Sequence, residues 1–476
     1  MSQVRTRFAP SPTGPLHIGG LRTALYNFAF AKSQNGQFIL RIEDTDRKRF
    51  IPGTTEKIYE ILNVFGLAWD EGPLIGGSYA PYIQSERVPS GLYRKYAEKL
   101  LEEGHAYYCF CEAKSKEEIE DDQEKKRVNL RDENCRNLSS EEVKKRIASG
   151  VKTAIRLRVP DKNQIIEYRD FIINKETDKK IGWFTEDIDE VMLLKSDGFP
   201  TYHLAVVVDD ALMQITHILR GHDWLPSTPV HLLLFEYLDF PRPEIGHLTD
   251  ILDPAGGKLS KRKGSVSCEE FLAEGYLPEA ILNFIMLLGW APKDNRELFT
   301  FEDFVKNFPE GNLQIANPIF NRQKLDWFNG FYIRKTQNSK LKTQIYQFYQ
   351  KKYPEEIIER TLPLIKERIT KLSDYSSFAG FFFTKPKVNK RLFDTSAKEQ
   401  LAKALEVLEG LEDWEKENLE KALQELVQKE DWNIGKFFMN FRIAITGSKI
   451  TPPITDSVAI LGKKETLKRL ALLNNL

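Results

Sequence analysis

The chain has 476 residues, enough for about two to four domains, and its 69 Lys and Arg residues balance its 69 Asp and Glu residues, so the total charge gives no sign of a nucleic-acid partner. Four cysteines in this length argue against a disulfide framework and favour a reducing cytoplasm. The sequence lacks an apolar run of about 18–20 residues and a signal-peptide core, so we expect a cytoplasmic globular protein with no membrane segment.

The first strong pattern is a strand, a loop and a helix. Val4–Phe8 is short and apolar enough for a strand, and Leu21–Lys32 carries apolar residues at helical spacing. Between them, Phe8–Gly20 reads FAPSPTGPLHIGG, and its prolines and glycines predict a stiff loop. Such a junction offers backbone N–H groups and a helix N-terminus to a phosphate, with His17 at the helix start. A tight turn with a capping histidine is the alternative, because neither GxGxxG nor GxxxxGK[ST] occurs.

The next segments predict a parallel α/β sheet. Phe38–Ile42 is typical of a strand, and Thr54–Phe65 of an amphipathic helix. Leu204–Val208 is a continuous apolar run, which predicts a buried parallel strand, and Thr216–Leu219 predicts another strand. Ligands of open α/β sheets bind at the carboxyl ends of strands. The residues expected at those ends are Glu43, Asp209 and Arg220.

Between about residues 86 and 190 the patterns indicate an inserted α+β module, after which the core resumes at Val191–Leu194. Its expected elements are helices at Arg87–Gly104 and Lys114–Arg127 and strands at Val151–Val159 and Ile165–Ile172. From Cys268 onward the chain is predicted to be helical. The expected helices are Pro278–Leu288, Glu355–Tyr375, Ser396–Lys429, Lys436–Ala444 and Thr466–Leu472.

Two basic stretches stand out. Lys258–Gly264 reads KLSKRKG and predicts a mobile cationic loop, although a solvated basic turn would look the same. Asp326–Arg391 contains 14 Lys and Arg residues against 6 Asp and Glu residues, a local charge of 14 − 6 = +8. An offset of this size in a neutral chain favours a surface that faces a polyanion, and a solvated helical face is the alternative.

These motifs together carry a family resemblance. PSPTGPLHIGG resembles the HIGH motif of class I aminoacyl-tRNA synthetases in its glutamyl form, and KLSKR resembles their KMSKS motif. RIEDTD at Arg41–Asp46 and DGFPTYHLAVVVDD at Asp197–Asp210 are also similar to the glutamyl-tRNA synthetases. The match extends from Val4 to about Gly330, with weaker likeness to the end. The chain is thus identified as a member of the bacterial-type glutamyl-tRNA synthetase family.

The resemblance implies a Rossmann-like α/β nucleotide-binding catalytic domain with an inserted α+β connective domain, followed by an all-α anticodon-binding half. The implied boundaries are 1–85 and 191–245 for the catalytic domain, 86–190 for the connective domain that binds the acceptor end, 246–325 for the stem-contact domain with the KLSKR loop, and 326–391 and 392–476 for two anticodon-binding domains.

The implied reaction is ATP-dependent ligation of L-glutamate to tRNA(Glu) through glutamyl-adenylate and transfer to the 3′-terminal adenosine. The implied catalytic residues are His17, Lys258 and Lys261, which stabilise phosphate charge, while Mg²⁺ accompanies ATP. The implied ATP site consists of Pro10, Ser11, His17, Gly19, Gly20 and Lys261. The implied glutamate site consists of Arg7, Ser11, Glu43, Tyr202, Arg220 and Trp224, with Glu43 on the α-ammonium and Arg220 on the side-chain carboxylate.

The resemblance also suggests an anticodon contact. Leu364–Tyr375 is predicted to be helical and resembles the family helix that presents an arginine to the third anticodon base. Arg368 is the candidate in this register, with Lys366 two residues away. The implied partner is tRNA(Glu), with tRNA(Gln) as a further candidate, and we expect a monomer.

A zinc site is an open alternative. Cys109, Cys111 and Cys135 resemble the cysteines of a zinc site in some family members, where a Cys-x-His pair completes the set. Here Arg136 and Asn137 follow Cys135, so that histidine is absent. Structural zinc takes four Cys or His ligands, which leaves this set incomplete unless His105 replaces the missing one.

Three rival interpretations have less support. Glutaminyl-tRNA synthetases normally carry PEPNG where this chain has Ser11 to Gly14, and their anticodon domains are β-barrels. The truncated enzyme that modifies queuosine lacks the stretch after about residue 320. A catalytically inactive RNA-binding paralogue would not be expected to keep His17, Lys261 and the whole glutamate pocket.

Overall fold

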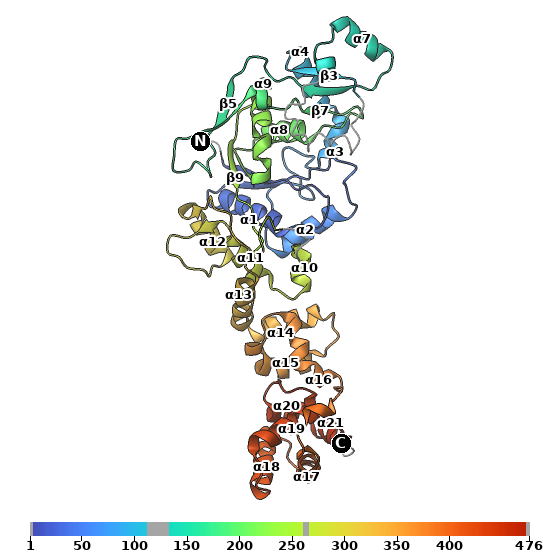
Figure 1. Ribbon diagram of the computed structural model, residues 1–476, viewed down its shortest axis with the longest axis vertical. Helices are drawn as coiled ribbons and strands as arrows, with labels where there is room; N and C mark the ends of the chain where they lie inside the picture. Colours follow the sequence, from blue (N-terminus) through green and yellow to red (C-terminus); the bar gives the residue numbers. More distant parts are fainter. Residues whose placement is uncertain (1–2, 112–132, 260–265, 473–476) are drawn as a thin grey trace. The chain divides into compact units, whose positions relative to one another are not determined.

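The computed structural model describes residues 3–111, 133–259 and 266–472 (Figure 1). The chain divides into two compact units. The first comprises Met1–Glu269 and Leu282–Asn321, and the second comprises Glu270–Ile281 and Arg322–Leu476. In the part of the chain that the structure describes, every helix is too short or too polar to cross a bilayer.

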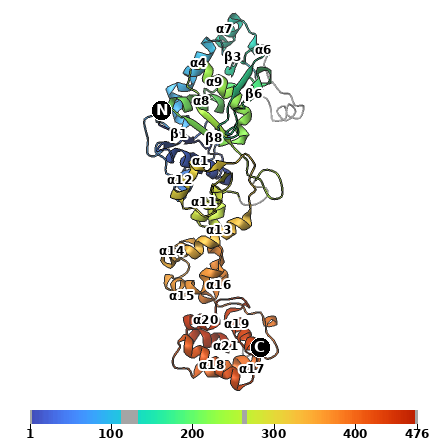
Figure 2. The same ribbon diagram turned by 90° about the vertical axis from the view of Figure 1, so that its left-hand side faces the viewer.

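The first unit contains the predicted parallel α/β core (Figure 2). Strand β1 (Arg5–Phe8) pairs in parallel with β2 (Gln37–Leu40), and α1 (Ile18–Lys32) connects them. Strand β8 (His217–Gly221) pairs in parallel with β9 (Glu244–Leu248). The two pairs adjoin, because the Thr216 N–H donates to the Arg5 carbonyl at 3.0 Å. The predicted strand–loop–helix at the N-terminus is confirmed, and the ends of β1 and β8 meet at one edge.

Further helices of the core are α2 (Thr54–Val64) and α9 (Thr228–Tyr237), and α2 confirms the predicted amphipathic helix. The first unit also contains α12 (Phe301–Asn307) and the short antiparallel strands β10 (Trp290–Ala291) and β11 (Asn312–Leu313). Two helices cross the boundary between the units, α10 (Cys268–Ala273) and α11 (Pro278–Met286).

The strand predicted at Leu204–Val208 is wrong, because these residues belong to helix α8 (Tyr202–Leu212). Every residue from Leu204 to Asp210 is buried, so the segment shows no helical alternation of apolar and polar residues. Asp209 and Asp210 therefore lie within a helix and not at a strand end. The Asp209 carboxylate accepts hydrogen bonds from the Tyr93 hydroxyl at 2.9 Å and the Gln84 amide at 2.8 Å, which joins α8 to the much earlier helices that carry these two residues.

The inserted module contains an antiparallel sheet in the order β3–β4–β7 and a hairpin of β5 and β6. Its strands are β3 (Ala106–Cys109), β4 (Ala154–Leu157), β5 (Ile165–Tyr168), β6 (Ile181–Phe184) and β7 (Met192–Leu194). Its helices are α3 (Gln84–Arg87), α4 (Leu92–Glu102), α6 (Glu133–Arg136) and α7 (Ser140–Ala148).

Two expectations for this module need correction. The helix predicted at Arg87–Gly104 is interrupted by Pro89 and by Gly91, whose φ of 72° is left-handed, so α4 begins only at Leu92. The segment Val191–Leu194 was assigned to the resumed core, but β7 pairs with β4 of the inserted module. The helix predicted at Lys114–Arg127 lies outside the described residues.

The described residues of the second unit are helical and contain no strand, as predicted for the C-terminal half (Figure 1, α13 to α21). Its helices are α13 (Arg322–Lys335), α14 (Asn338–Phe348), α15 (Glu355–Ile365), α16 (Tyr375–Phe383), α17 (Ala397–Glu409), α18 (Lys416–Lys429), α19 (Ile434–Thr446), α20 (Ile454–Leu461) and α21 (Lys463–Ala471).

Two long helices predicted in this unit are broken. The segment Glu355–Tyr375 is not one helix, because the Asp374 carboxylate accepts the backbone N–H groups of Thr370 and Lys371, both at 2.9 Å. This local turn competes with helical bonding. Arg368 consequently ends a short 3₁₀ turn, Lys366–Arg368, and the helix predicted at Leu364–Tyr375 is wrong. The predicted Ser396–Lys429 helix is two helices, α17 and α18, separated by a loop that begins at Gly410.

Candidate active site

A cavity of about 680 Å³ opens at the shared edge of β1 and β8, beside the first turn of α1. Its wall contains most of the residues predicted for the ATP and glutamate sites: Arg7, Ser11, His17, Gly19, Gly20, Glu43, Tyr202, Arg220, Trp224 and Lys258. Pro10 supports this wall, since its carbonyl accepts the Glu43 N–H at 3.0 Å. Lys261 lies outside the described residues.

The His17 side chain caps α1. Its Nδ1 accepts the Gly19 N–H at 3.0 Å, so Nε2 carries the ring proton of the neutral imidazole. The capping role and a ligand role are therefore compatible, because they use different ring nitrogens. The chain after the KLSKRKG stretch returns to this point, where the Ile18 N–H donates to Val266 and the Cys268 N–H donates to Leu16, both at 2.9 Å. The flanks of the two motifs thus lie side by side.

Beneath the cavity, two arginines and two carboxylates form a balanced buried network. The Arg41 guanidinium lies 2.6 Å from the Asp210 carboxylate and 2.8 Å from that of Glu43, and Arg7 lies 3.1 Å from Asp210. Burial acts to raise the pKa of Asp210, but Arg41 and Arg7 outweigh it and hold this pKa below its usual value. Burial raises the pKa of Glu43 although Arg41 opposes the shift. Glu43 is thus an acidic group with only one direct cationic partner among the described residues.

Arg220 is held differently. It is 4% exposed, and its guanidinium donates to His247 Nε2 at 3.0 Å and to His231 Nδ1 at 2.9 Å. It also donates to the Thr228 hydroxyl at 2.8 Å and the Trp224 carbonyl at 3.2 Å. All four acceptors are uncharged, and no ion pair involves Arg220 within residues 3–111, 133–259 and 266–472. Burial lowers its pKa, but a guanidinium stays charged, so the cavity wall contains a cation ready for an anionic ligand.

The remaining wall combines aromatic rings and a lysine. The rings of Tyr202 and Trp224 stack with centroids 4.1 Å apart, and burial raises the pKa of Tyr202 to about 12, so its hydroxyl stays neutral. The Lys258 ammonium pairs with Asp223 and lies 2.9 Å from the Asp250 carboxylate. A phosphate that binds Lys258 would have to compete with these two carboxylates.

Sequence reasoning missed two parts of the site. Arg22 lines the cavity and donates to the carbonyls of Leu288, at 3.0 Å, and Thr249. The histidines around Arg220 were also missed, because His231 and His247 lie 11 and 27 residues beyond it and match no motif. His247 lies opposite Arg220 in the parallel pairing of β8 with β9, a register that the local sequence does not reveal.

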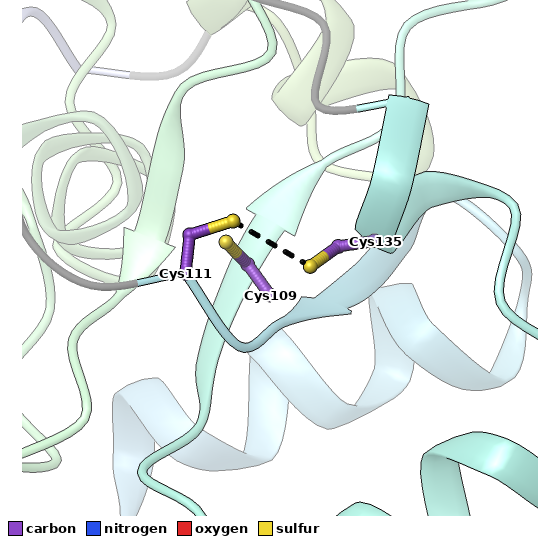
Figure 3. A group of neighbouring side chains, drawn as sticks. All are labelled: Cys109, Cys111 and Cys135. Atoms are coloured by element: carbon purple, nitrogen blue, oxygen red, sulfur yellow. Dashed lines mark hydrogen bonds between the residues drawn. The ribbon is translucent and has the colours of Figure 1, made fainter.

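The three cysteines of the inserted module come together at the end of β3 (Figure 3). The sulfur atoms of Cys109, Cys111 and Cys135 all lie within 4.8 Å of one another, and those of Cys111 and Cys135 are 3.7 Å apart. Four thiolates around zinc with Zn–S bonds of about 2.3 Å would be about 3.8 Å apart. The three thiols therefore fit three corners of a zinc site. Among the described residues, no His, Cys, Asp or Glu side chain supplies the fourth corner.

Comparison with known proteins agrees with this geometry. A family model described as tRNA synthetases class I (E and Q), catalytic domain, matches residues 3–327, and an anticodon binding domain model matches residues 335–473. The chain is 40% identical over 489 residues to a glutamate–tRNA ligase of Borreliella afzelii, covering 98% of this chain and 97% of that protein. It is 39% identical over 508 residues to that of Treponema denticola, covering 98% of each.

A solved structure is similar along the whole chain. It is the crystal structure of a glutamate tRNA ligase from Elizabethkingia meningosepticum in complex with its amino acid, with a TM-score of 0.84, 35% identity and coverage of 100% of this chain and 99% of that one. The fold and both family models thus define a class I tRNA synthetase with a catalytic half and a helical anticodon-binding half. Within that class, the chain belongs to the glutamate–tRNA ligase family.

Acid should weaken the fold through the half-buried imidazole of His203. Burial lowers the pKa of His203 to about 4, so the folded protein keeps the ring neutral while the unfolded chain, with the ordinary value of 6.5, takes up a proton. The free energy of unfolding therefore falls as the pH drops from about 6.5 to about 4. His203→Asn should remove up to about 2 kcal/mol of the loss between about pH 7.5 and pH 5. Urea unfolding measures this, with His222→Asn, an exposed histidine, as control. Equal losses in His203→Asn and the unchanged protein would contradict the prediction.

Proposed function

We propose that the chain ligates L-glutamate to tRNA(Glu) in two steps, through glutamyl-adenylate. Both steps take place in the cavity at the edge of β1 and β8. The observation that carries the proposal is Arg220, a buried cation that pairs with no carboxylate among the described residues, in the same cavity as the Glu43 carboxylate. Glutamate is a small molecule with one ammonium group and two carboxylates. In this assignment Glu43 binds the α-ammonium and Arg220 binds the side-chain carboxylate, with Arg7 and Tyr202 nearby.

The first step needs the α-carboxylate of glutamate to attack the α-phosphorus of ATP, which releases pyrophosphate. His17 can donate from Nε2 at the N-terminus of α1, where Gly19 and Gly20 leave room for phosphate oxygens and Pro10 and Ser11 shape the approach. Lys258 reaches the phosphates once it leaves Asp223 and Asp250, and Lys261 is assigned the same role from the motif. These groups supply positive charge as the leaving group forms. Mg²⁺ enters as the counter-ion of ATP.

In the second step the terminal ribose hydroxyl of the tRNA attacks the carbonyl carbon of glutamyl-adenylate and loses its proton, the bond from that carbon to the phosphate oxygen breaks, and AMP leaves. The helical unit is assigned to the anticodon arm, with phosphate contacts positioning the tRNA. Arg368 lies close enough to Arg442 that, after burial, it is the second cause of the lowered pKa of Arg442. Arg368 lies in the stretch Asp326–Arg391, whose local charge is +8, whereas Arg442 lies outside it on α19. Two neighbouring arginines favour a polyanion at this point. We assign the chain to the cytoplasm as a monomer, with tRNA(Gln) as a second substrate to be tested.

The three-cysteine cluster is assigned to zinc as a structural ion. Cys109 and Cys111 come from the end of β3 and Cys135 from α6, so a bound ion would join these two elements. Water or a residue outside the described part of the chain would complete its coordination.

The amino-acid assignment is tested on Arg220. Arg220→Gln should lower kcat/KM for glutamate at least about a hundredfold, because a buried ion pair loses one partner at a cost of roughly 3 kcal/mol. Aminoacylation of tRNA(Glu) and ATP–pyrophosphate exchange, each with glutamate and with glutamine, measure the effect. Arg22→Gln is the matched control, since both arginines are 4% exposed in the same cavity. If Arg220→Gln keeps the ratio of kcat/KM for glutamate over kcat/KM for glutamine, the assignment is contradicted. No charging by the unchanged protein would overturn the function.

The anticodon assignment is tested on Arg368. Arg368→Gln should narrow the preference for tRNA(Glu) over tRNA(Gln) about tenfold, the lower range for loss of one base contact. Glutamate activation should be unaffected. The measurement is kcat/KM for both transcripts at one fixed salt concentration, with Arg360→Gln, an exposed arginine of α15, as control. Equal losses for both tRNAs would show that Arg368 binds a backbone phosphate, and no change would place anticodon recognition elsewhere.

The zinc assignment is tested by elemental analysis of protein purified without added metal. We expect close to one zinc per chain, retained in Cys268→Ser and lost in Cys109→Ser, because Cys268 lies outside the cluster. Protein without zinc, or zinc that survives Cys109→Ser, would contradict the assignment.

A further inference from the structure

The uncharged partners of Arg220 form a continuous hydrogen-bonded network inside the first unit. An arginine only donates hydrogen bonds, so the nitrogen of each histidine that faces it must present a lone pair. His247 therefore accepts with Nε2 and carries its proton on Nδ1, which lies 2.7 Å from the Asp170 carboxylate. His231 accepts with Nδ1, so its Nε2 carries the proton and donates to His203 Nδ1 at 3.2 Å. The geometry makes both partners of Arg220 neutral imidazoles.

Neutrality also agrees with the surroundings. His231 and His247 are 2% and 0% exposed. Burial lowers the pKa of each, and the charge of Arg220 lowers both further, although Asp170 opposes the shift at His247. Arg7 also faces His231 and disfavours its protonation. Protonation of either imidazole, which would place a further positive charge in contact with Arg220, is thus disfavoured.

The nearest carboxylate in this network, that of Asp170, contacts His247 and not Arg220 itself. Other groups also donate hydrogen bonds to it. Asp170 accepts the backbone N–H groups of Ile172 and Ile173, both at 2.9 Å, and the Tyr168 hydroxyl at 2.9 Å. Because these donors and His247 stabilise its charge, Asp170 orients His247 without pairing directly with the guanidinium. The inserted module thereby fixes the position of Arg220, since Tyr168 ends β5.

This arrangement separates two functions that a carboxylate partner would combine. A carboxylate in contact with Arg220 would orient the guanidinium and also neutralise it, and it would compete with a carboxylate of the substrate. A neutral imidazole orients the guanidinium and leaves its charge to the ligand. An amide side chain, as in glutamine, is neutral and gains much less from that charge.

We infer that His231 and His247 are positioning residues that set the selectivity of the site for a side-chain carboxylate over the corresponding amide, because they orient Arg220 without neutralising it. The inference rests on the proposed function and adds the two histidines that make the site selective for glutamate over glutamine.

The test is a pair of isosteric variants at His231. In His231→Asn the side-chain oxygen takes the place of Nδ1 as a neutral acceptor, and in His231→Asp the same atom carries charge. His231→Asn should keep the ratio of kcat/KM for glutamate over glutamine within about threefold of the unchanged protein. His231→Asp should lower the ratio about tenfold or more, through the KM for glutamate with kcat nearly unchanged, since charge-assisted hydrogen bonds are about twice as strong as neutral ones.

The control is the same pair at His217, which lies on β8 with Arg220 but bonds to Thr216. Neither His217→Asn nor His217→Asp should change the ratio. If His231→Asp does not fold, His247→Gln and His247→Glu place a neutral and a charged oxygen near Nε2 and carry the same expectation. Equal ratios within a folded Asn/Asp or Gln/Glu pair would overturn the inference while glutamate charging by the unchanged protein would still support the proposed function.

Discussion

The site depends on one buried guanidinium, that of Arg220, which forms no ion pair with any residue that the structure describes. Removing a charge from water costs several kcal/mol even after the protein relaxes. The fold offsets this cost at Arg220 with four hydrogen bonds to His231, His247, Thr228 and Trp224, none of them to an anion. In the proposed assignment a ligand carboxylate would supply this counter-charge, and the folding of the first unit would already have oriented the guanidinium for it.

The charged side chains near Arg220 pair with one another, which distinguishes Arg220 from Arg7 and Arg41. Arg7 and Arg41 share Asp210, and Arg41 also binds Glu43, so these cations already have partners. This balance requires α8 to be a helix, because the helix brings Asp210 beneath Arg7 and turns Asp209 toward Tyr93. In the proposed assignment the ammonium of a bound amino acid contacts Glu43, which follows β2, and its side-chain carboxylate contacts Arg220 on β8.

Local sequence patterns predict the strands and the helix that carry the site, but they do not predict the residues packed around Arg220. The strand–loop–helix around His17 and the strand carrying Arg220 follow from short stretches of sequence, and the structure contains both. Helix α8 was predicted as a strand because it is buried on all sides and its valines mask the helical period. The end of α15 depends on a side chain, Asp374, that captures backbone N–H groups nearby. The pairing of β8 with β9 brings His247 to Arg220, and α9 brings His231, so no local pattern could indicate these histidines.

A crystal structure with bound glutamate tests the central claim most directly. The account predicts that the side-chain carboxylate lies about 2.7–2.9 Å from the guanidinium nitrogens of Arg220, the ordinary length of such a charge-assisted bond. It also predicts that Glu43 contacts the α-ammonium and that His231 and His247 keep their bonds to Arg220. A side-chain carboxylate bound to Arg7 or Arg22, with Arg220 out of contact with the ligand, would contradict the account.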